Sequence, residues 1–114
     1  MNSIAEKIQW ASRSDVPPLA GNEIHVWATA LSVDSASLQN LSTTLSPDET
    51  ERAKRFKFDK HRNRYIAGRG VLRAILWKYV QSRPTELSFD YLTNGKPTLA
   101  ATFASAGIHF NLAH

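Results

Sequence analysis

The first patterned stretch of the chain is residues 23–31, EIHVWATAL, whose side chains alternate about an extended backbone as they do in a β-strand. Ile24 and Val26 fall on one side, and His25 and Trp27 on the other. Because both sides are largely apolar, the pattern predicts a strand that is buried on both faces. The preceding residues, 1–22, contain DVPPLAGN, whose prolines and glycine disfavour a helix, so we expect an extended lead-in there.

Helical periodicity follows in three segments. A short helix is predicted within residues 32–45, where three leucines recur at helical spacing. The next helix begins at Ser46, because Pro47 suits the first helical position and Glu49 completes a capping box with Ser46. The longest helix is predicted over residues 61–81, where apolar side chains recur every three or four positions along one stripe.

The same helix contains two glycines and three arginines whose positions relative to the stripe differ. Gly68 and Gly70 each lower helix propensity by about 1 kcal/mol relative to alanine, so we expect them to permit close packing against a sheet. Arg62, Arg69 and Arg73 fall away from the stripe or at its edge.

The rest of the chain reads as strands. Residues 86–92, ELSFDYL, alternate, and Asn94-Gly95 is a strong signal for a hairpin turn because both residues tolerate a positive φ. Residues 108–114, IHFNLAH, alternate again. A strand, then helices, then strands predict an α+β fold, with helices packed on one face of a mainly antiparallel sheet.

Charge is concentrated in one part of the chain. Of the 14 Lys and Arg residues, nine lie between Arg52 and Arg73, and Asp59 is the only acid among them. Such a cluster attracts anions, either the phosphates of nucleic acid or those of a cofactor, unless it is simply a solvated helix face. With no cysteine, no secretory leader and no long apolar run, we expect a cytoplasmic protein.

Two short motifs add candidate chemistry. The turn NGKP either leaves Lys96 in solvent or presents Lys96 and backbone N–H groups to a ligand. His114, with Asn111 nearby, is either a hydrogen-bonded structural residue or a donor to phosphate. The histidines show no spacing typical of metal ligands.

The order and spacing of these motifs are more specific than each motif alone. LSPDETERAKRFKFDKHRNRYIAGRGVLRAIL, then NGKP, then FNLAH resemble the N-terminal half of the Sfp-type 4′-phosphopantetheinyl transferases. The resemblance covers residues 23–114. It implies a fold of two similar α+β halves, with coenzyme A and Mg²⁺ between them, of which this chain would be the N-terminal half. The C-terminal half would be absent.

The resemblance also implies a coenzyme A site. Arg52 matches a basic position that contacts the 3′-phosphate, and the turn at 95–97 matches one that lies along the adenine side of the nucleotide. The FNLAH segment matches a motif whose histidine contacts phosphate. The implied cofactor-binding residues are Arg52, Gly95, Lys96, Pro97, Asn111, Ala113 and His114.

Three departures from the family pattern affect the expected activity. Ala113 replaces a serine, which would weaken binding by about 1.5–3 kcal/mol if no water takes the place of the hydroxyl. Glu49 lies where some members have a phosphate-binding lysine, and we expect it to serve the helix cap instead. The family's acidic metal-binding motif and its KEA-type motif do not occur in these 114 residues. We therefore expect no catalytic residue and no metal ligand in this chain.

The resulting hypothesis is the coenzyme A-binding half of a 4′-phosphopantetheinyl transferase, inactive alone. The intact enzyme would move phosphopantetheine onto a serine of an acyl or peptidyl carrier protein in fatty acid, polyketide or nonribosomal peptide synthesis. An exposed half-domain interface would favour self-association. The alternatives are a non-catalytic module that binds coenzyme A or another nucleotide and, as a weaker hypothesis, a nucleic-acid-binding basic domain, which would show steep salt dependence.

Overall fold

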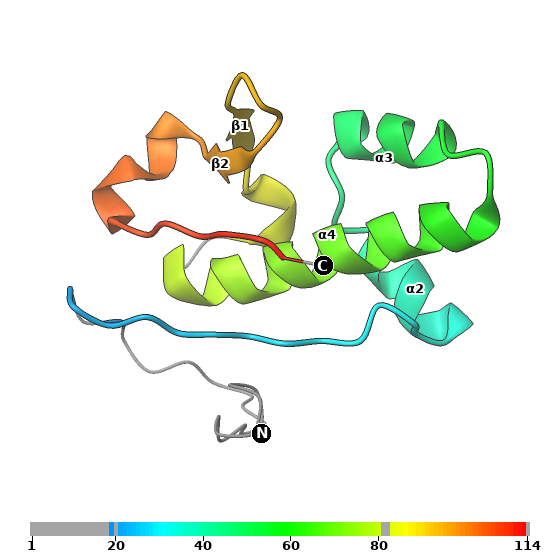
Figure 1. Cartoon of the computed structure of the whole chain (residues 1–114), viewed down its shortest axis with the longest axis horizontal. Coiled ribbons are helices and arrows are strands. Elements are labelled where there is room, and N and C mark those ends of the chain that lie inside the picture. Colours follow the sequence, from blue (N-terminus) through cyan, green and yellow to red (C-terminus); the bar gives the residue numbers. More distant parts are fainter. Residues whose placement is uncertain (1–18, 20, 81–82, 114) are drawn as a thin grey trace, which may run out of the picture.

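A computed structural model of the chain describes residues 19, 21–80 and 83–113, and it confirms the α+β fold. Figure 1 shows the long helix α4 at the centre, with α3 and a hairpin on one side of it and α2 on the other. In chain order, the elements are α2 (Ser35–Ser42), α3 (Pro47–Lys54), α4 (Asp59–Val80), the 3₁₀ turn η1 (Pro84–Glu86), β1 (Phe89–Tyr91), β2 (Pro97–Leu99) and the 3₁₀ segment η2 (Ala101–Ala106).

Each of the two short helices begins at a capping residue, of which only Ser46 is predicted from the sequence. The Asp34 carboxylate accepts a hydrogen bond from Ser37 N at 2.7 Å and caps α2. At α3 the capping box is confirmed: Ser46 Oγ accepts from Glu49 N at 3.4 Å, and Glu49 Oε1 accepts from Ser46 N at 3.0 Å. These reciprocal bonds satisfy N–H groups that have no partner within the helix.

Helix α4 confirms the predicted long helix and begins two residues earlier than predicted, at Asp59. The prediction that its two glycines pack against a sheet is wrong. A Cβ atom on Gly70 would lie 2.7 Å from Leu41 Cβ of α2, whereas one on Gly68 would meet only Leu31 Cδ2, at 3.6 Å. The close neighbour of Gly70 is therefore helix α2. The β1–β2 hairpin lies on another side of α4 (Figure 1). No helix in the described part of the chain is long and apolar enough to cross a membrane.

The predicted hairpin is confirmed. Strands β1 and β2 pair antiparallel, with Phe89 opposite Leu99 and Tyr91 opposite Pro97. Gly95 has a φ of +85°, which residues other than glycine rarely adopt, and its N–H donates to Leu92 O at 2.8 Å. The hairpin covers one side of α4, where Leu72, Leu76 and Leu87 form the buried core.

The predicted strand at residues 23–31 is wrong in two respects. The segment is extended and runs along α4 (Figure 1), but it belongs to no described sheet. It is also not buried on both faces, because Ile24 is 89% exposed and Val26 63% exposed. On the other side, His25 and Trp27 contact Tyr79 of α4. No described strand lies beside the segment to pair with its backbone.

The strand predicted at residues 108–114 is also not assigned where the structure describes it. Residues 107–113 run along α4 without joining the sheet, and the Phe110 ring packs edge-on against Phe89 with a centroid distance of 5.9 Å. His114 and most of the predicted lead-in, residues 1–18 and 20, lie outside the described residues. The predicted domain boundary near residue 22 therefore stays a prediction.

Candidate functional site

A buried ion-pair cluster joins α3 to α4. Glu49 and Arg73 are each 1% exposed, and Arg73 Nη2 lies 2.6 Å from Glu49 Oε1, with Nε donating to the same oxygen at 2.7 Å. Arg69 Nη1 lies 3.3 Å from Glu49 Oε2. Arg69 and Arg73 fall away from the apolar stripe or at its edge in the sequence, yet both side chains are largely buried. Both guanidinium groups turn inward because the capping glutamate of α3 provides their buried counter-charge.

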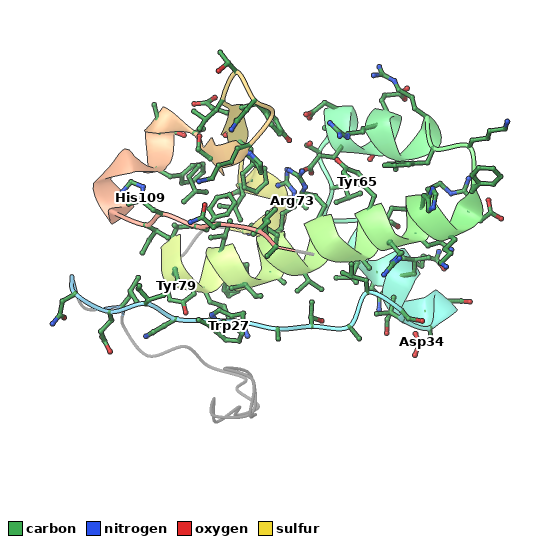
Figure 2. The ribbon with its side chains drawn as sticks, viewed as in Figure 1. Trp27, Asp34, Tyr65, Arg73, Tyr79 and His109 are labelled. Atoms are coloured by element: carbon green, nitrogen blue, oxygen red, sulfur yellow. The ribbon has the colours of Figure 1, made fainter. Side chains whose placement is uncertain are left out.

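The same cluster reaches the base of the hairpin. Arg73 Nη1 donates to Leu87 O at 2.6 Å, and its guanidinium carbon lies 5.1 Å from the centroid of the Phe89 ring. Figure 2 shows Arg73 extending from α4 toward the space between the hairpin and α3. Two cations on one helix therefore connect the first turn of α3, α4 and the hairpin.

A second set of contacts alternates cations with aromatic rings. The Arg52 guanidinium of α3 lies 5.6 Å from the Tyr65 ring centroid, and the Arg69 guanidinium lies 5.5 Å from the same ring. Arg69 also lies 5.9 Å from the Tyr91 ring, and its Nη1 donates to Tyr91 Oη at 2.9 Å. These contacts form a continuous path from Arg52 to the hairpin, and each cation–aromatic pair contributes about 0.5–2 kcal/mol.

Tyr65 lies at the centre of this path, between α3 and α4 (Figure 2). Its hydroxyl is buried and has no hydrogen-bond partner among the described residues. Burial raises the pKa of the Tyr65 hydroxyl, although the neighbouring Arg69 charge acts in the opposite direction. Tyr65 therefore stays neutral and offers its ring to the two flanking cations.

Two of the three predicted coenzyme A segments lie at the ends of this path. Arg52 is exposed on α3. At the other end, Gly95, Lys96 and Pro97 form the turn and the start of β2, where Asn94 Oδ1 accepts a hydrogen bond from Lys96 N at 3.1 Å. Arg52 and the hairpin turn are therefore connected through Tyr65, Arg69 and Tyr91. Their roles in ligand binding stay predictions.

The third segment lies on a different feature, an open cleft of about 1320 Å³ between residues 23–33, α4 and residues 108–113. Exposed Asn111 and Ala113 line it, but Arg52 and the turn residues 95–97 do not. The described residues therefore do not bring all the predicted contacts into one cavity.

A polar contact that sequence reasoning missed holds one wall of this cleft. Trp27 Nε1 donates to Tyr79 Oη at 2.8 Å, and His25 Nδ1 lies 2.7 Å from the same oxygen. Figure 2 shows Trp27 of the extended segment and Tyr79 of α4 pointing toward each other. Because an indole N–H can only donate, the Tyr79 proton is available to His25 Nδ1. This contact fixes the extended segment against α4.

The turn between α3 and α4 presents a cationic surface. Arg62 pairs with Asp59, and Lys54 pairs with Glu51. Arg55, Lys60 and Arg64 have no such partner within the described residues, so the surface retains excess positive charge. No group of three or more His, Asp or Glu side chains is placed to hold a metal ion in that part of the chain. We therefore assign no step that involves Mg²⁺ to these residues.

The arginines of α4 were predictable in one respect. Tyr65, Arg69 and Arg73 follow each other at intervals of four, so they share one helix face. That spacing places the three side chains on one side of the helix, but it does not show that the buried Glu49 faces the two arginines.

Comparisons with known proteins agree on one family. The family model described as 4′-phosphopantetheinyl transferase, N-terminal, matches residues 32–114. The 4′-phosphopantetheinyl transferase HetI of Nostoc sp. is 44% identical over 105 residues, which cover 92% of this chain and 44% of HetI. A phosphopantetheinyl transferase of Thraustochytrium sp. is 30% identical over 105 residues, 86% of this chain and 34% of the relative. The chain thus spans less than half the length of these curated relatives. No solved structure matches the chain significantly.

Proposed function

The chain belongs to the 4′-phosphopantetheinyl transferase family, and from that premise we propose that it provides the coenzyme A-binding half of such an enzyme. The intact enzyme transfers phosphopantetheine from coenzyme A to a serine of an acyl or peptidyl carrier protein. The observation that carries the proposal is the family match over residues 32–114, which contains every residue that the resemblance assigns to coenzyme A. The order of the sequence motifs supports the Sfp-type branch of the family.

The proposed binding chemistry is recognition of phosphate by fixed cations. Coenzyme A carries a 3′-phosphate and a pyrophosphate, so a surface with excess positive charge would bind it from solution. Arg52 is exposed on α3, with its guanidinium supported by the Tyr65 ring, and it is free to contact the 3′-phosphate. In this proposal, Lys96 and the backbone of the hairpin turn contact the adenine side of the bound nucleotide.

Calorimetric titration of the 114-residue chain with coenzyme A and with dephospho-coenzyme A tests the proposal. Hydrogen bonds to charged groups contribute about 1.5–3 kcal/mol, so we expect coenzyme A to bind at least tenfold more tightly than the dephospho form. Arg52→Ala should remove that preference and leave the affinity for dephospho-coenzyme A unchanged. Arg83→Ala, which changes an exposed arginine at the start of η1, serves as the control. Equal affinity of the wild-type chain for both ligands would contradict the assignment of Arg52.

Catalysis by this chain alone is not part of the proposal. Phosphoryl-type transfer needs a metal ion to neutralise developing charge and a base for the attacking hydroxyl. The sequence motifs that provide these groups in the family do not occur in the 114 residues. We expect no modification of an apo-carrier protein by the purified chain with coenzyme A and Mg²⁺, as followed by mass spectrometry. Stoichiometric conversion in that assay would refute this expectation.

The exposed apolar side of residues 23–31 supports a further element of the proposal, self-association. Ile24 and Val26, on the side of the segment opposite His25 and Trp27, are 89% and 63% exposed, and Leu112 is 44% exposed. We expect concentration-dependent sedimentation that Ile24→Ser with Val26→Ser reduces. Phe58→Ser is the control, because Phe58 is 58% exposed on the separate α3–α4 turn.

The proposal includes a cytoplasmic location, which fits a sequence without cysteine.

A further inference from the structure

The guanidinium of Arg69 contacts both elements that carry the ends of the cation–aromatic path, helix α3 and the β1–β2 hairpin, although it belongs to neither. Its Nη1 lies 3.3 Å from Glu49 Oε2 on α3 and donates to Tyr91 Oη on β1 at 2.9 Å. The Arg69 side chain is only 10% exposed, and its guanidinium carbon lies 5.4 Å from the Phe89 ring centroid. The group is therefore held by α3 and by the hairpin at the same time.

We propose that Arg69 is a positioning residue that fixes α3 relative to the β1–β2 hairpin, so that Arg52 and Lys96 meet the same coenzyme A molecule. The inference rests on the proposed function, because it requires the two segments to share one ligand. Arg69 itself does not contact the ligand in this proposal, and its effect passes through Glu49 and Tyr91.

The register of the hairpin explains how Arg69 reaches the turn. Tyr91 lies opposite Pro97, the residue that follows Lys96, so a shift of Tyr91 moves the start of β2 and the turn with it. Arg73 holds a different point, Leu87 O, which precedes β1 and lies deeper in the core. Arg73 therefore anchors the base of the hairpin, whereas Arg69 controls the end nearer the turn.

The chemistry of the side chain supports this assignment. A guanidinium is planar and offers several donors in fixed directions, so it can hold a carboxylate and a hydroxyl in a defined relative position. Aromatic rings from Tyr65, Phe89 and Tyr91 surround the Arg69 guanidinium and restrict its rotamers. A lysine would present a single point charge on a flexible stem and would not fix both partners.

A double-mutant cycle on the 114-residue chain, read by titration with coenzyme A, tests the proposal. Arg69→Gln should weaken binding by about tenfold when Lys96 is present, but by less than twofold in the Lys96→Ala background. Loss of fold stability alone would lower the affinity by the same factor in both backgrounds. Arg83→Gln, the same change at an exposed arginine, should leave the affinity unchanged, and Arg69→Lys should recover only part of the loss. Far-ultraviolet circular dichroism at the titration temperature verifies that each variant is folded.

The possible outcomes separate this proposal from the proposed function. If the wild-type chain does not bind coenzyme A, both fail. If it binds and Arg69→Gln has equal effects in the two Lys96 backgrounds, only the positioning role fails. Should Arg69→Gln not fold, Tyr91→Phe makes the same test, because it removes the acceptor of the Arg69 bond and keeps the ring. A loss of two- to threefold that disappears in the Lys96→Ala background would support the proposal, and equal factors would overturn it.

Discussion

Changing Glu49 to glutamine tests the claim that the buried ion-pair cluster holds the helices together. The substitution keeps the size of the side chain and an oxygen that can still accept from Ser46 N, so the cap geometry can persist. It removes the negative charge that faces Arg73, which is 1% exposed, and Arg69. The perturbation therefore isolates the charge from the cap.

The expected cost follows from the burial of the pair. Removal of one partner of a buried ion pair costs about 3–5 kcal/mol, because the remaining charge is left without compensation. A domain of this size has a total unfolding free energy of about 5–15 kcal/mol, so the loss is a large part of its stability. With a urea m-value of about 1–3 kcal/mol/M, the midpoint should fall by about 2 M.

Urea unfolding followed by circular dichroism measures the effect, and α3 contains a matched control. Glu51→Gln makes the same change two residues away, in an ion pair with Lys54 whose partners are 63% and 68% exposed. Surface pairs of this kind contribute about 0.3–0.5 kcal/mol. If Glu49→Gln costs no more than Glu51→Gln, the carboxylate is not the counter-charge of Arg73 and the description of the cluster is wrong.

Three further predictions concern the fold and its pH dependence. Gly70→Ala should lower the melting temperature, because its Cβ would clash with Leu41 of α2, whereas Gly68→Ala should raise stability by up to about 1 kcal/mol through helix propensity. Burial raises the pKa of Tyr65, so its contribution is complete below about pH 10 and is lost as pH rises through the folded-state value. Tyr65→Phe should therefore lose less stability than wild type in alkaline unfolding curves, and equal losses would contradict the buried hydroxyl. The Ser37 N–H bond holds the pKa of Asp34 below its ordinary value, so its contribution is present above about pH 4 and is lost as pH falls through the folded-state value. The difference in melting temperature between wild type and Asp34→Asn should shrink at acidic pH, and an unchanged difference would show that the cap does not titrate.

Local signals in the sequence were sufficient for the helices and the hairpin. The capping box at Ser46 and Glu49, the long apolar stripe of α4 and the Asn94-Gly95 turn act over a few residues, so they predict their elements without knowledge of the rest of the fold. The same local motifs carried the family resemblance, and the match over residues 32–114 confirms the family. The ligand roles of the predicted site residues stay predictions.

Whether the two alternating segments form strands depends on their neighbours in the fold. Residues 23–31 and 108–113 have the side-chain alternation of strands, but a strand also needs a hydrogen-bonded neighbour, and the described residues provide none. Alternation therefore predicted which side chains share a face of residues 23–31, while the tertiary structure determined that His25 and Trp27 face α4 and that Ile24 and Val26 face solvent.

The buried charges show the same division. By itself, the sequence determined that Glu49 caps α3 and that Arg69 and Arg73 share one face of a helix, because both properties arise within a few turns of chain. Only the tertiary structure decided that these groups meet, since Glu49 and Arg73 are 24 positions apart. A buried arginine needs a compensating charge, and here the carboxylate belongs to a different helix. No pattern within α4 alone predicts which residue of another element provides it.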